Sequence, residues 1–275
     1  MKKYKTILIV FFMIIVLFIM TIPILNMIGT SLKTEAEILT NNNLFSTNIT
    51  FEHYIDVFQK TPFLSYMYNS FVIAVSVTLL CTIVSALAGY AISRYKSRIR
   101  FFKIYLDLLL VLQMFPVILM LIPLFMLFKF YGLSSTRISA ILIYGTFALP
   151  FSIWMLSGFF DGIPNELEEA GVIDGCSQFQ CFIRLILPIS SPGIASVAIF
   201  TFLNCWNEYL LASIFLKREE IRTLQLGLQN FIQQFHIDWG SLTAAATITI
   251  IPAVFFLIFL QKYIVRGLTS GAVKG

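Results

Sequence analysis

Six stretches of mostly apolar residues, each about 20 residues long, dominate this chain. A helix needs about 20 residues to cross a hydrocarbon layer about 30 Å thick. Because lipid offers no hydrogen-bond partner to the backbone, such segments cross a membrane as helices. The sequence therefore predicts an all-α polytopic membrane protein with six transmembrane helices. These stretches are residues 7–28, 69–92, 104–128, 138–160, 193–215 and 242–265.

The composition supports this class. Hydrophobic residues make up 58% of the chain, charged residues only 12%, and the mean hydropathy is +0.87. These values lie far outside those of a soluble domain. Cys81 and Cys205 fall inside predicted spans and Cys176 and Cys181 between two of them, so no disulfide or metal spacing is indicated.

Basic residues predict the orientation. They are concentrated before the first span, between the second and third, and after the last, whereas the opposite loops hold fewer, mixed with acids. We therefore expect both termini and the segment 161–192 to be cytoplasmic. We interpret the basic excess as a topology signal and infer no nucleic-acid partner from it. The deciding residues are Lys2, Lys3, Lys5, Arg94, Lys96, Arg98, Arg100, Lys103, Lys262, Arg266 and Lys274.

The amino terminus has lysines before an apolar core, as a signal peptide does, but the core is too long and no small-residue cleavage pattern follows. We expect an uncleaved first helix. The predicted organisation is a first helix with an external loop over residues 1–68, and a core transmembrane domain over 69–275 that contains the polar segment 161–192.

That polar segment carries the signals of two short helices. Pro164 suits the first turn of a helix, and the acids that follow, Glu166 among them, suit the positive end of its dipole. Gly175 is a natural stop for this helix. Ser177 and Gln180 form a capping box that starts a second helix, which we expect to end before Pro188.

The second helix presents an apolar face. Phe179, Phe182, Ile183 and Ile186 recur at helical spacing. Burying one such Phe gains about 1.5–3 kcal/mol, so the face is expected to find a partner. Two interpretations are open: an amphipathic loop at the membrane surface, or a helix that docks into a groove on another protein.

The same segment resembles a known motif. Glu169-Ala170-Gly171, then Asp174-Gly175, then Leu187-Pro188 and Pro192 are similar to the Glu-Ala-Ala loop of permease subunits of ATP-binding cassette importers, with Gly171 in place of the usual second alanine and Cys176 where a small alanine is common. The resemblance implies a cytoplasmic coupling helix, between spans four and five, that docks into a groove on a cytosolic ATPase. The coupling residues it implies are Glu168, Glu169, Ala170, Gly171, Asp174, Gly175, Phe179, Phe182 and Pro188.

The second and third spans contain features that shape helix packing. Small residues from Ala86 to Ser93 allow close approach of helices and again resemble the permease family. In the third span, Gln113 precedes Pro116, and Pro123 follows at membrane depth. A packed kink and a position that lines a pathway both explain this arrangement.

The fifth span contains a polar cluster: Asn204, Trp206, Asn207, Glu208 and Tyr209. A carboxylate at membrane depth costs at least ~2.5 kcal/mol against lipid, so Glu208 should face the bundle interior or a water-filled cavity. Amide and carboxylate groups beside aromatic rings suit a sugar; a polar clamp between helices is the structural alternative. This stretch resembles sugar-importing members of the family, which favours a translocation path that also includes Gln113.

Taken together, the resemblance implies one permease subunit of a carbohydrate importer of the maltose-type branch, multi-pass in a bacterial cell membrane. It implies a second homologous permease subunit, two cytosolic ATP-binding cassette subunits and an external sugar-binding protein as partners, with a sugar as substrate. This chain has no Gly-Lys-Ser/Thr phosphate loop, so it is expected not to be an enzyme: ATP and Mg would be bound by the ATPase subunits, and no cofactor or metal by this chain.

Two other classes were weighed. A secondary transporter uses paired intramembrane carboxylates and repeated halves, whereas Glu208 is the one strong intramembrane acid and no inverted repeat is evident. An intramembrane enzyme needs a nucleophile with a base or a metal cluster. The only histidines, His53 and His236, lie outside the spans and are expected to be solvated. The Gly-rich tail, 261–275, is either flexible or in contact with the ATPases.

Overall fold

The computed structural model describes residues 2–40, 43–44, 46, 48–233 and 237–272, with side chains described within these ranges from Tyr4 to Gln261. His236 and the last residues of the Gly-rich tail, 273–275, lie outside the described residues. Within the described ranges the chain is helical, and its one β-type pairing is an isolated bridge between Ile232 and Ile237. The all-α prediction is confirmed.

Four helices are long and apolar enough to cross a membrane on their own. Two further pairs of helices qualify only when each pair is taken as one bent span. The structure thus offers four helices of spanning length, and up to six spans when each bent pair is counted as one. The four continuous helices are α1 (Lys2–Ser31), α4 (Phe63–Tyr95), α7 (Arg137–Asp161) and α14 (Trp239–Ala272).

The third span differs from the straight helix that its hydropathy suggests. Helix α5 (Arg100–Gln113) and helix α6 (Val117–Phe130) meet at an angle of 99°. The break lies at Met114-Phe115-Pro116, where Pro116 has no N–H to continue the backbone ladder. Pro123, in contrast, is accommodated inside α6. Pro116 therefore breaks this span and Pro123 does not.

The fifth span also differs from the expected run of residues 193–215. Helix α11 (Ser191–Trp206) ends at Trp206, and a separate short helix, α12, covers Leu210–Phe215. The polar residues at 207–209 interrupt the helix. Before α11, the helical segment Gln178–Ile189 joins it at an angle of 73°.

The remaining elements are short. Two of them, α2 (Glu35–Thr40) and α3 (Glu52–Lys60), follow α1. Another three connect α12 to α14: η2 (Glu219–Ile221), α13 (Leu224–Gly227) and η3 (Leu228–Phe231). The four elements between α7 and α11 belong to the polar segment: α8 (Glu166–Ile173), α9 (Gln178–Cys181), η1 (Phe182–Ile186) and α10 (Leu187–Ile189).

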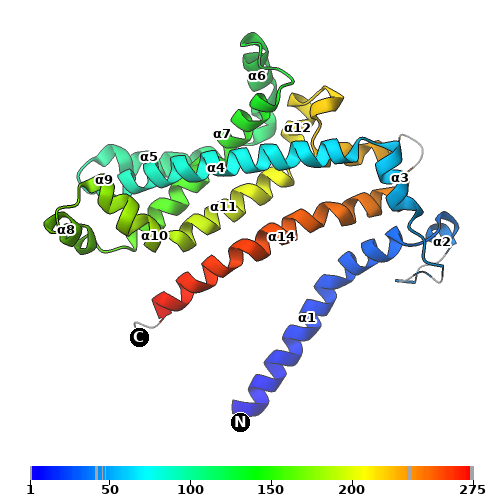
Figure 1. The fold of residues 1–275 in the computed structure, drawn as a ribbon, viewed down its shortest axis with the longest axis horizontal. Coiled ribbons are helices and arrows are strands. Elements are labelled where there is room, and N and C mark those ends of the chain that lie inside the picture. Colours follow the sequence, from blue (N-terminus) through cyan, green and yellow to red (C-terminus); the bar gives the residue numbers. More distant parts are fainter. Residues whose placement is uncertain (1, 41–42, 45, 47, 234–236, 273–275) are drawn as a thin grey trace. The chain divides into compact units, whose positions relative to one another are not determined.

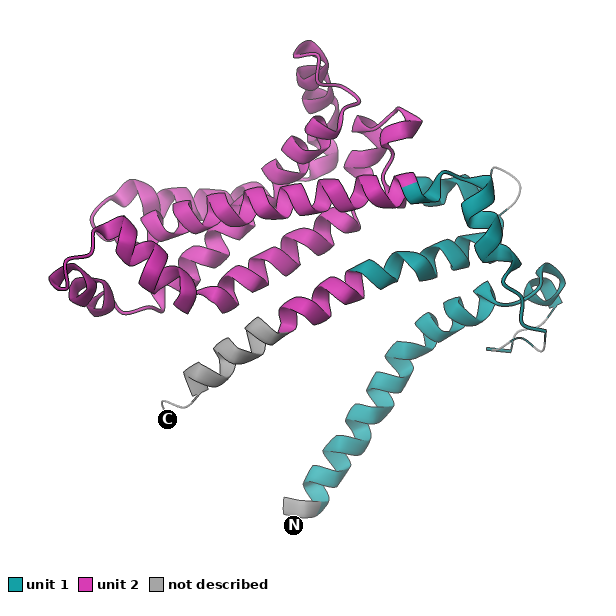
Figure 2. Cartoon of the chain, in the orientation of Figure 1, with its two compact units in different colours: residues 1–64, 227–252 teal, residues 65–226, 253–275 magenta. Residues whose placement is uncertain are grey.

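The chain forms two compact units (Figures 1 and 2). The first comprises residues 1–64 and 227–252, and the second 65–226 and 253–275. The first boundary falls close to residue 68, where the sequence suggests that the core domain begins, and residues 227–252 join the amino-terminal unit. Both stretches that carry candidate site residues lie in the second unit.

Helix α7 is the centre of the second unit, and it packs against both α5 and α11 (Figure 1). A buried cluster joins Leu156 and Phe160 of α7 to Phe182, Ile186 and Val197. Helix α4 approaches α7 closely at Gly89, where a Cβ atom would lie 3.0 Å from the backbone nitrogen of Ser157. The predicted close approach of the small residues in α4 is confirmed.

In the first unit, His53 is not a solvated loop residue. It lies on α3, its side chain is 8% exposed, and its Nε2 is 2.9 Å from the backbone oxygen of Lys33. The solvation expected from the sequence is therefore wrong. A polar loop composition did not reveal that this segment folds back on itself.

Candidate functional site

Helix α8 begins and ends where the sequence indicates. Asn165 occupies the N-cap position, and the first turn carries Glu166, Glu168 and Glu169. The helix ends at Ile173 with Asp174 as its C-cap, and Gly175 has a φ of 88°, a left-handed conformation that favours glycine. The Gly175 backbone N–H donates to the oxygen of Val172 at 3.0 Å. The predicted glycine stop is confirmed.

The second helix starts with the predicted capping box. Ser177 Oγ accepts from the backbone N–H of Gln180 at 3.3 Å, and the Gln180 side chain accepts from the backbone N–H of Ser177 at 2.9 Å. The helix then continues past the expected stop, because α9 passes into the π-helical turn η1 and then into α10, which contains Pro188. In η1 the Leu187 N–H donates to Phe182 O, a wider register that accommodates the proline without its N–H.

Gly171 lets α8 pack tightly on the second helix. A Cβ at this position would lie 2.7 Å from Cδ1 of Leu185 and 2.9 Å from Sγ of Cys181. Gly171 is buried, and Cys181 is 1% exposed. This chain therefore has a specific steric reason for glycine at position 171.

Glu168 joins α8 to α4. Its Oε2 accepts from the hydroxyl of Tyr90 at 2.6 Å, and its Oε1 pairs with Nε of Arg94 at 2.5 Å. Nη1 of Arg94 also donates to the backbone oxygen of Phe160 at 3.0 Å. The two charged side chains are only 12% and 17% exposed, so water screens the pair weakly. Nη2 of Arg94 is buried without a partner among the described residues.

A second carboxylate attaches α4 to the end of α7. Oδ1 of Asp161 accepts from the hydroxyl of Ser93 at 2.7 Å, and Oδ2 pairs with Nζ of Lys96. Asp161 is the last residue of α7 and Glu168 lies in α8. Both carboxylates thus fix one end of α4 to the two sides of the α7–α8 connection.

The apolar stripe of the second helix is divided between the interior and the surface. Phe182 is 4% exposed and lies 4.6 Å from the ring of Tyr90, centroid to centroid, and Ile186 is fully buried. Phe179 and Ile183 are 64% and 45% exposed. The apolar stripe is therefore not one docking face: Phe182 and Ile186 pack inside this chain, and Phe179 and Ile183 are exposed.

Most of the predicted coupling residues remain at the surface. Leu167, Val172 and Ile173 of α8 are also exposed, and Ile173 has 85% of its surface accessible. This end of the unit therefore presents an apolar surface next to carboxylates. Among the predicted residues, Glu168 is half-buried, Gly171 and Phe182 are buried, and the exposed ones are Glu169, Ala170, Asp174, Gly175, Phe179 and Pro188.

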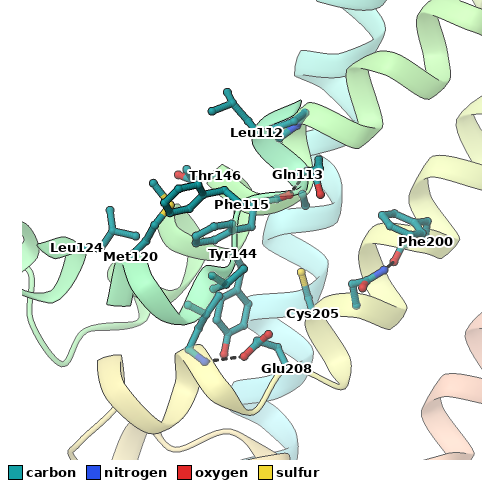
Figure 3. Close-up of a pocket in the computed structure, with 16 residues that line it drawn as sticks. Leu112, Gln113, Phe115, Met120, Leu124, Tyr144, Thr146, Phe200, Cys205 and Glu208 are labelled. Atoms are coloured by element: carbon teal, nitrogen blue, oxygen red, sulfur yellow. Dashed lines mark hydrogen bonds between the residues drawn. The ribbon is translucent and has the colours of Figure 1, made fainter. Parts of the chain in front are cut away.

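The second candidate region is a cavity of about 340 Å³ that opens behind the α5–α6 bend (Figure 3). Gln113, at the end of α5, donates from Nε2 to the backbone oxygen of Phe147 at 2.9 Å. Phe147 lies in the part of α7 that precedes Pro150, which also lines the cavity. The bend and the proline-containing helix thus form one wall together.

Three of the predicted path residues line this cavity: Gln113, Asn204 and Glu208. Nδ2 of Asn204 donates to the oxygen of Phe200 in its own helix at 2.8 Å. Oε1 of Glu208 accepts from the backbone N–H of Leu211 at 2.6 Å, which holds the carboxylate at the start of α12. Glu208 is therefore one of the residues that line the cavity.

The other three predicted path residues are not among the cavity's lining residues. Trp206 is 1% exposed and stacks on Phe202, with ring centroids 5.6 Å apart. Asn207 is exposed at the end of α11, and its Nδ2 donates to Leu203 O at 2.9 Å. Tyr209, next along the chain, is 37% exposed. Only part of the polar cluster faces the cavity.

Tyr144 is a lining residue that the sequence analysis missed. It lies on α7, is 3% exposed, and points toward Glu208 in Figure 3. Its hydroxyl has no hydrogen-bond partner among the described residues. A tyrosine in the middle of a predicted span was an available signal, because a buried tyrosine hydroxyl usually needs a partner. Arg94 and Tyr90 were also missed, since their partner Glu168 is distant in the sequence.

Within the described residues, no group of three or more His, Cys, Asp or Glu side chains is placed to hold a metal ion. The second unit instead combines a cavity within a bundle of continuous and bent membrane-length helices with a polar pair of short helices at one end. This arrangement is that of a multi-pass membrane protein.

The comparisons with known proteins identify the family. The chain belongs to the family described as the binding-protein-dependent transport system inner membrane component, whose model matches residues 85–270. It is therefore a membrane component of a binding-protein-dependent, ATP-binding cassette transport system.

Curated relatives extend over nearly the whole chain. The trehalose/maltose transport system permease protein MalG of Thermococcus litoralis is 36% identical, over 98% of each chain. The sulfoquinovosyl glycerol transport system permease protein SmoH of Agrobacterium fabrum is 34% identical, over 92% of this chain and 88% of that protein. Both relatives are permeases.

A solved structure shares the fold. A chain from the crystal structure of a bacterial ABC transporter involved in the import of the acidic polysaccharide alginate matches with a TM-score of 0.80. The match covers 95% of this chain and 96% of that chain, at 22% identity. The permease fold is therefore that of a solved ABC transporter.

Proposed function

We propose that this chain is a permease subunit of an ATP-driven sugar importer, that its segment 161–192 couples it to a cytosolic ATPase, and that the cavity lines half of the translocation path. The single observation that carries the coupling proposal is the construction of α8. This helix is tied to α4 through Glu168 while its apolar residues, Val172 and Ile173 among them, face outward.

A helix that transmits motion needs a firm attachment on one side and a docking surface on the other. The Glu168 contacts supply the attachment, because the Arg94 guanidinium and the Tyr90 hydroxyl occupy both carboxylate oxygens. The exposed Leu167, Val172 and Ile173 supply apolar area that a groove on a partner would bury. This pattern supports docking of a protein against α8.

The distribution of charge supports an orientation in the membrane. Lysines and arginines precede the first span and fill the α4–α5 connection, the same end at which Arg94 contacts α8. Because basic loops remain in the cytoplasm, this bias supports a cytoplasmic position for segment 161–192 and for both termini. The coupling surface would then face the compartment that contains ATP.

The sugar class follows from the relatives and the cavity. Relatives transport trehalose or maltose and sulfoquinovosyl glycerol, as their names state. The cavity offers a carboxylate, an amide and a phenol among apolar side chains, groups that suit sugar hydroxyls and ring faces. We infer a second permease subunit, two ATPase subunits and an external sugar-binding protein as partners.

The experiment is purification of the tagged chain in mild detergent from its native cells, beside the variants Gly175→Arg and Gly175→Asn. Gly175 is exposed and a Cβ at this residue would meet no atom within 4 Å, so the first carbon of either new side chain has room. Asparagine tolerates a positive φ, whereas arginine combines backbone strain with bulk at the docking surface. We expect a P-loop ATPase and a second permease to co-purify with wild type and Gly175→Asn, and the ATPase to be lost from Gly175→Arg.

If no ATPase co-purifies with an intact wild-type preparation, the proposed function is wrong, and an ion-coupled transporter becomes the leading alternative. If the ATPase stays bound to Gly175→Arg, the importer assignment stands and the docking role of segment 161–192 is rejected. The first outcome therefore tests the importer function, and the second tests the docking role of segment 161–192.

A further inference from the structure

We infer that the cavity behind the α5–α6 bend is a binding site for uncharged sugar hydroxyls that rejects anionic sugars, and that Glu208 and Tyr144 set this preference. The inference deepens the proposed function and rests on it, because it takes a sugar as the substrate. The juxtaposition that supports it is a carboxylate beside an unpartnered, buried phenol, in a cavity that is lined mostly by apolar side chains (Figure 3).

The first step concerns the hydroxyl of Tyr144. This side chain is 3% exposed and its hydroxyl has no partner among the described residues, although the residue lines the cavity. Leaving a buried hydroxyl unpaired is costly, so a group that enters the cavity and can hydrogen-bond it gains free energy. A phenol both donates and accepts a hydrogen bond, and a sugar hydroxyl matches both roles.

The second step concerns the capacity of Glu208. Its Oε1 already accepts from the backbone N–H of Leu211 at 2.6 Å, which fixes the carboxylate without neutralising it. An ionised carboxylate has about four lone-pair positions, so it retains capacity to accept from donors in the cavity. Sugar hydroxyls are such donors. Glu208 and Tyr144 can therefore bind neighbouring hydroxyl groups of one ring.

The third step is the charge balance of the cavity. Glu208 is the only charged residue among the 16 that line it in the part of the chain that the structure describes; none is Lys, Arg or His. The other lining residues include Phe115, Phe147 and Phe200, so the carboxylate acts in surroundings of low dielectric constant, where charges interact strongly. An anionic sugar would enter against this charge with no cation to compensate.

This property is not a necessary feature of the fold. The solved transporter that shares the fold takes part in the import of an acidic polysaccharide, and the relative SmoH is named for sulfoquinovosyl glycerol, whose sulfonate group is anionic. The preference inferred here must therefore come from the side chains of this cavity and not from the arrangement of its helices. Glu208 is the side chain that excludes acidic sugars on electrostatic grounds.

The test measures the cavity's charge directly, without knowledge of the natural sugar. Thr146 lines the cavity and is exposed, so Thr146→Cys introduces a thiol there, in a background whose native cysteines are replaced. Membranes containing the complete transport system are treated with a cationic and an anionic methanethiosulfonate reagent of similar size. We expect the cationic reagent to react at least about tenfold faster, since a cleft of one charge sign concentrates counter-ions by about that factor or more.

Two variants in the Thr146→Cys chain assign the effect. Glu208→Gln should bring the ratio of the two rates close to one, whereas Asp107→Asn, which removes an exposed carboxylate from α5 that does not line the cavity, should leave it unchanged. A ratio near one in the parent, or an unchanged ratio in Glu208→Gln, overturns the charge preference.

Sugar protection tests the hydroxyl site. Maltose at high concentration should slow labelling by the neutral reagent methyl methanethiosulfonate, and its acidic counterpart maltobionate should not. Tyr144→Phe should weaken the protection by maltose about threefold to tenfold, the usual effect of losing one hydrogen bond, while the ratio of rates for the charged reagents stays the same. Equal protection by both sugars, or no protection by maltose, overturns the binding site.

These outcomes are independent of the proposed coupling. The labelling rates depend on the cavity alone, so they can fail while the ATPase still co-purifies with the chain. Conversely, loss of the ATPase in the purification experiment does not alter the expected ratio of labelling rates. Failure of the inference and failure of the proposed function are thus distinguishable.

Discussion

The α8 attachment and the cavity both place carboxylates inside the second unit, but they use them differently. Glu168 is held by two donors from α4, one on each of its oxygens. In the cavity, Glu208 accepts from the backbone of Leu211, and the hydroxyl of Tyr144 has no partner within the described chain. A paired network stabilises one arrangement of helices, whereas an unpaired polar group in a cavity favours an occupant. The pairing of their polar atoms therefore supports the mechanical role that we propose for one region and the binding role that we propose for the other.

The largest expected effect comes from removing the side chain of Glu168. Glu168→Ala leaves the poorly exposed Arg94 guanidinium without its carboxylate, which costs on the order of 3 kcal/mol for a buried pair. We expect a clear fall in the melting temperature of the purified complex and a loss of sugar uptake per ATP hydrolysed. The matched control is Glu169→Ala, whose side chain is exposed.

Glu169→Ala should leave the melting temperature unchanged and weaken only the association with the ATPase. The contrast between the two neighbouring glutamates separates attachment from docking. Equal melting temperatures for both variants would contradict the mechanical role of Glu168.

The second prediction concerns the cavity. Glu208→Leu removes its one carboxylate, and we expect uptake to fall about tenfold, equivalent to about 1.4 kcal/mol, while the ATPase still co-purifies. Asn207→Leu is the matched control, because Asn207 does not line the cavity and bonds the backbone of its own helix. The measurement is sugar uptake by whole cells that express the two variants at equal levels. An equal loss of uptake in both variants would favour the alternative in which the polar cluster only holds helices together.

The smallest expected effect is at Gly171. Gly171→Ala puts a methyl group 2.7 Å from Cδ1 of Leu185 and 2.9 Å from Sγ of Cys181, so the ends of these two side chains must move, at a cost of about 1 kcal/mol. The double variant with Cys181→Ala should recover part of the lost stability, because it removes one of the two clashing atoms. Thermal unfolding of the single and double variants measures the coupling. Strictly additive effects would show that α8 does not pack as described.

Local signals predicted the short helices well. The glutamates of the first turn, Gly175 at the stop and the capping box of Ser177 and Gln180 act between residues within one or two turns, so their outcome depends little on the rest of the chain. The exception was Pro188. Its effect was absorbed by the wider π-helical turn that precedes it, a change of register that residue preferences do not reveal.

Features that depend on distant partners could not be predicted in the same way. Helical spacing placed Phe182 beside Phe179 on one apolar face, but only packing against Tyr90 and Phe160 decides that Phe182 turns inward. Likewise, Glu168 and Arg94 are 74 residues apart in the chain. Hydropathy predicted where the third span lies, yet the 99° bend depends on how α6 packs against α12 as well as on Pro116.

The two contacts of Glu168 on α4 have a mechanical consequence. Tyr90 and Arg94 are four residues apart, so they lie one turn above the other on the same face of α4. A single contact would leave α4 free to rotate about that contact. An attachment at two points along the axis resists swivelling, and the Asp161 contacts with Ser93 and Lys96 add a brace nearby. In the coupling that we propose, a displacement of α8 would therefore rotate α4 as well as shift it.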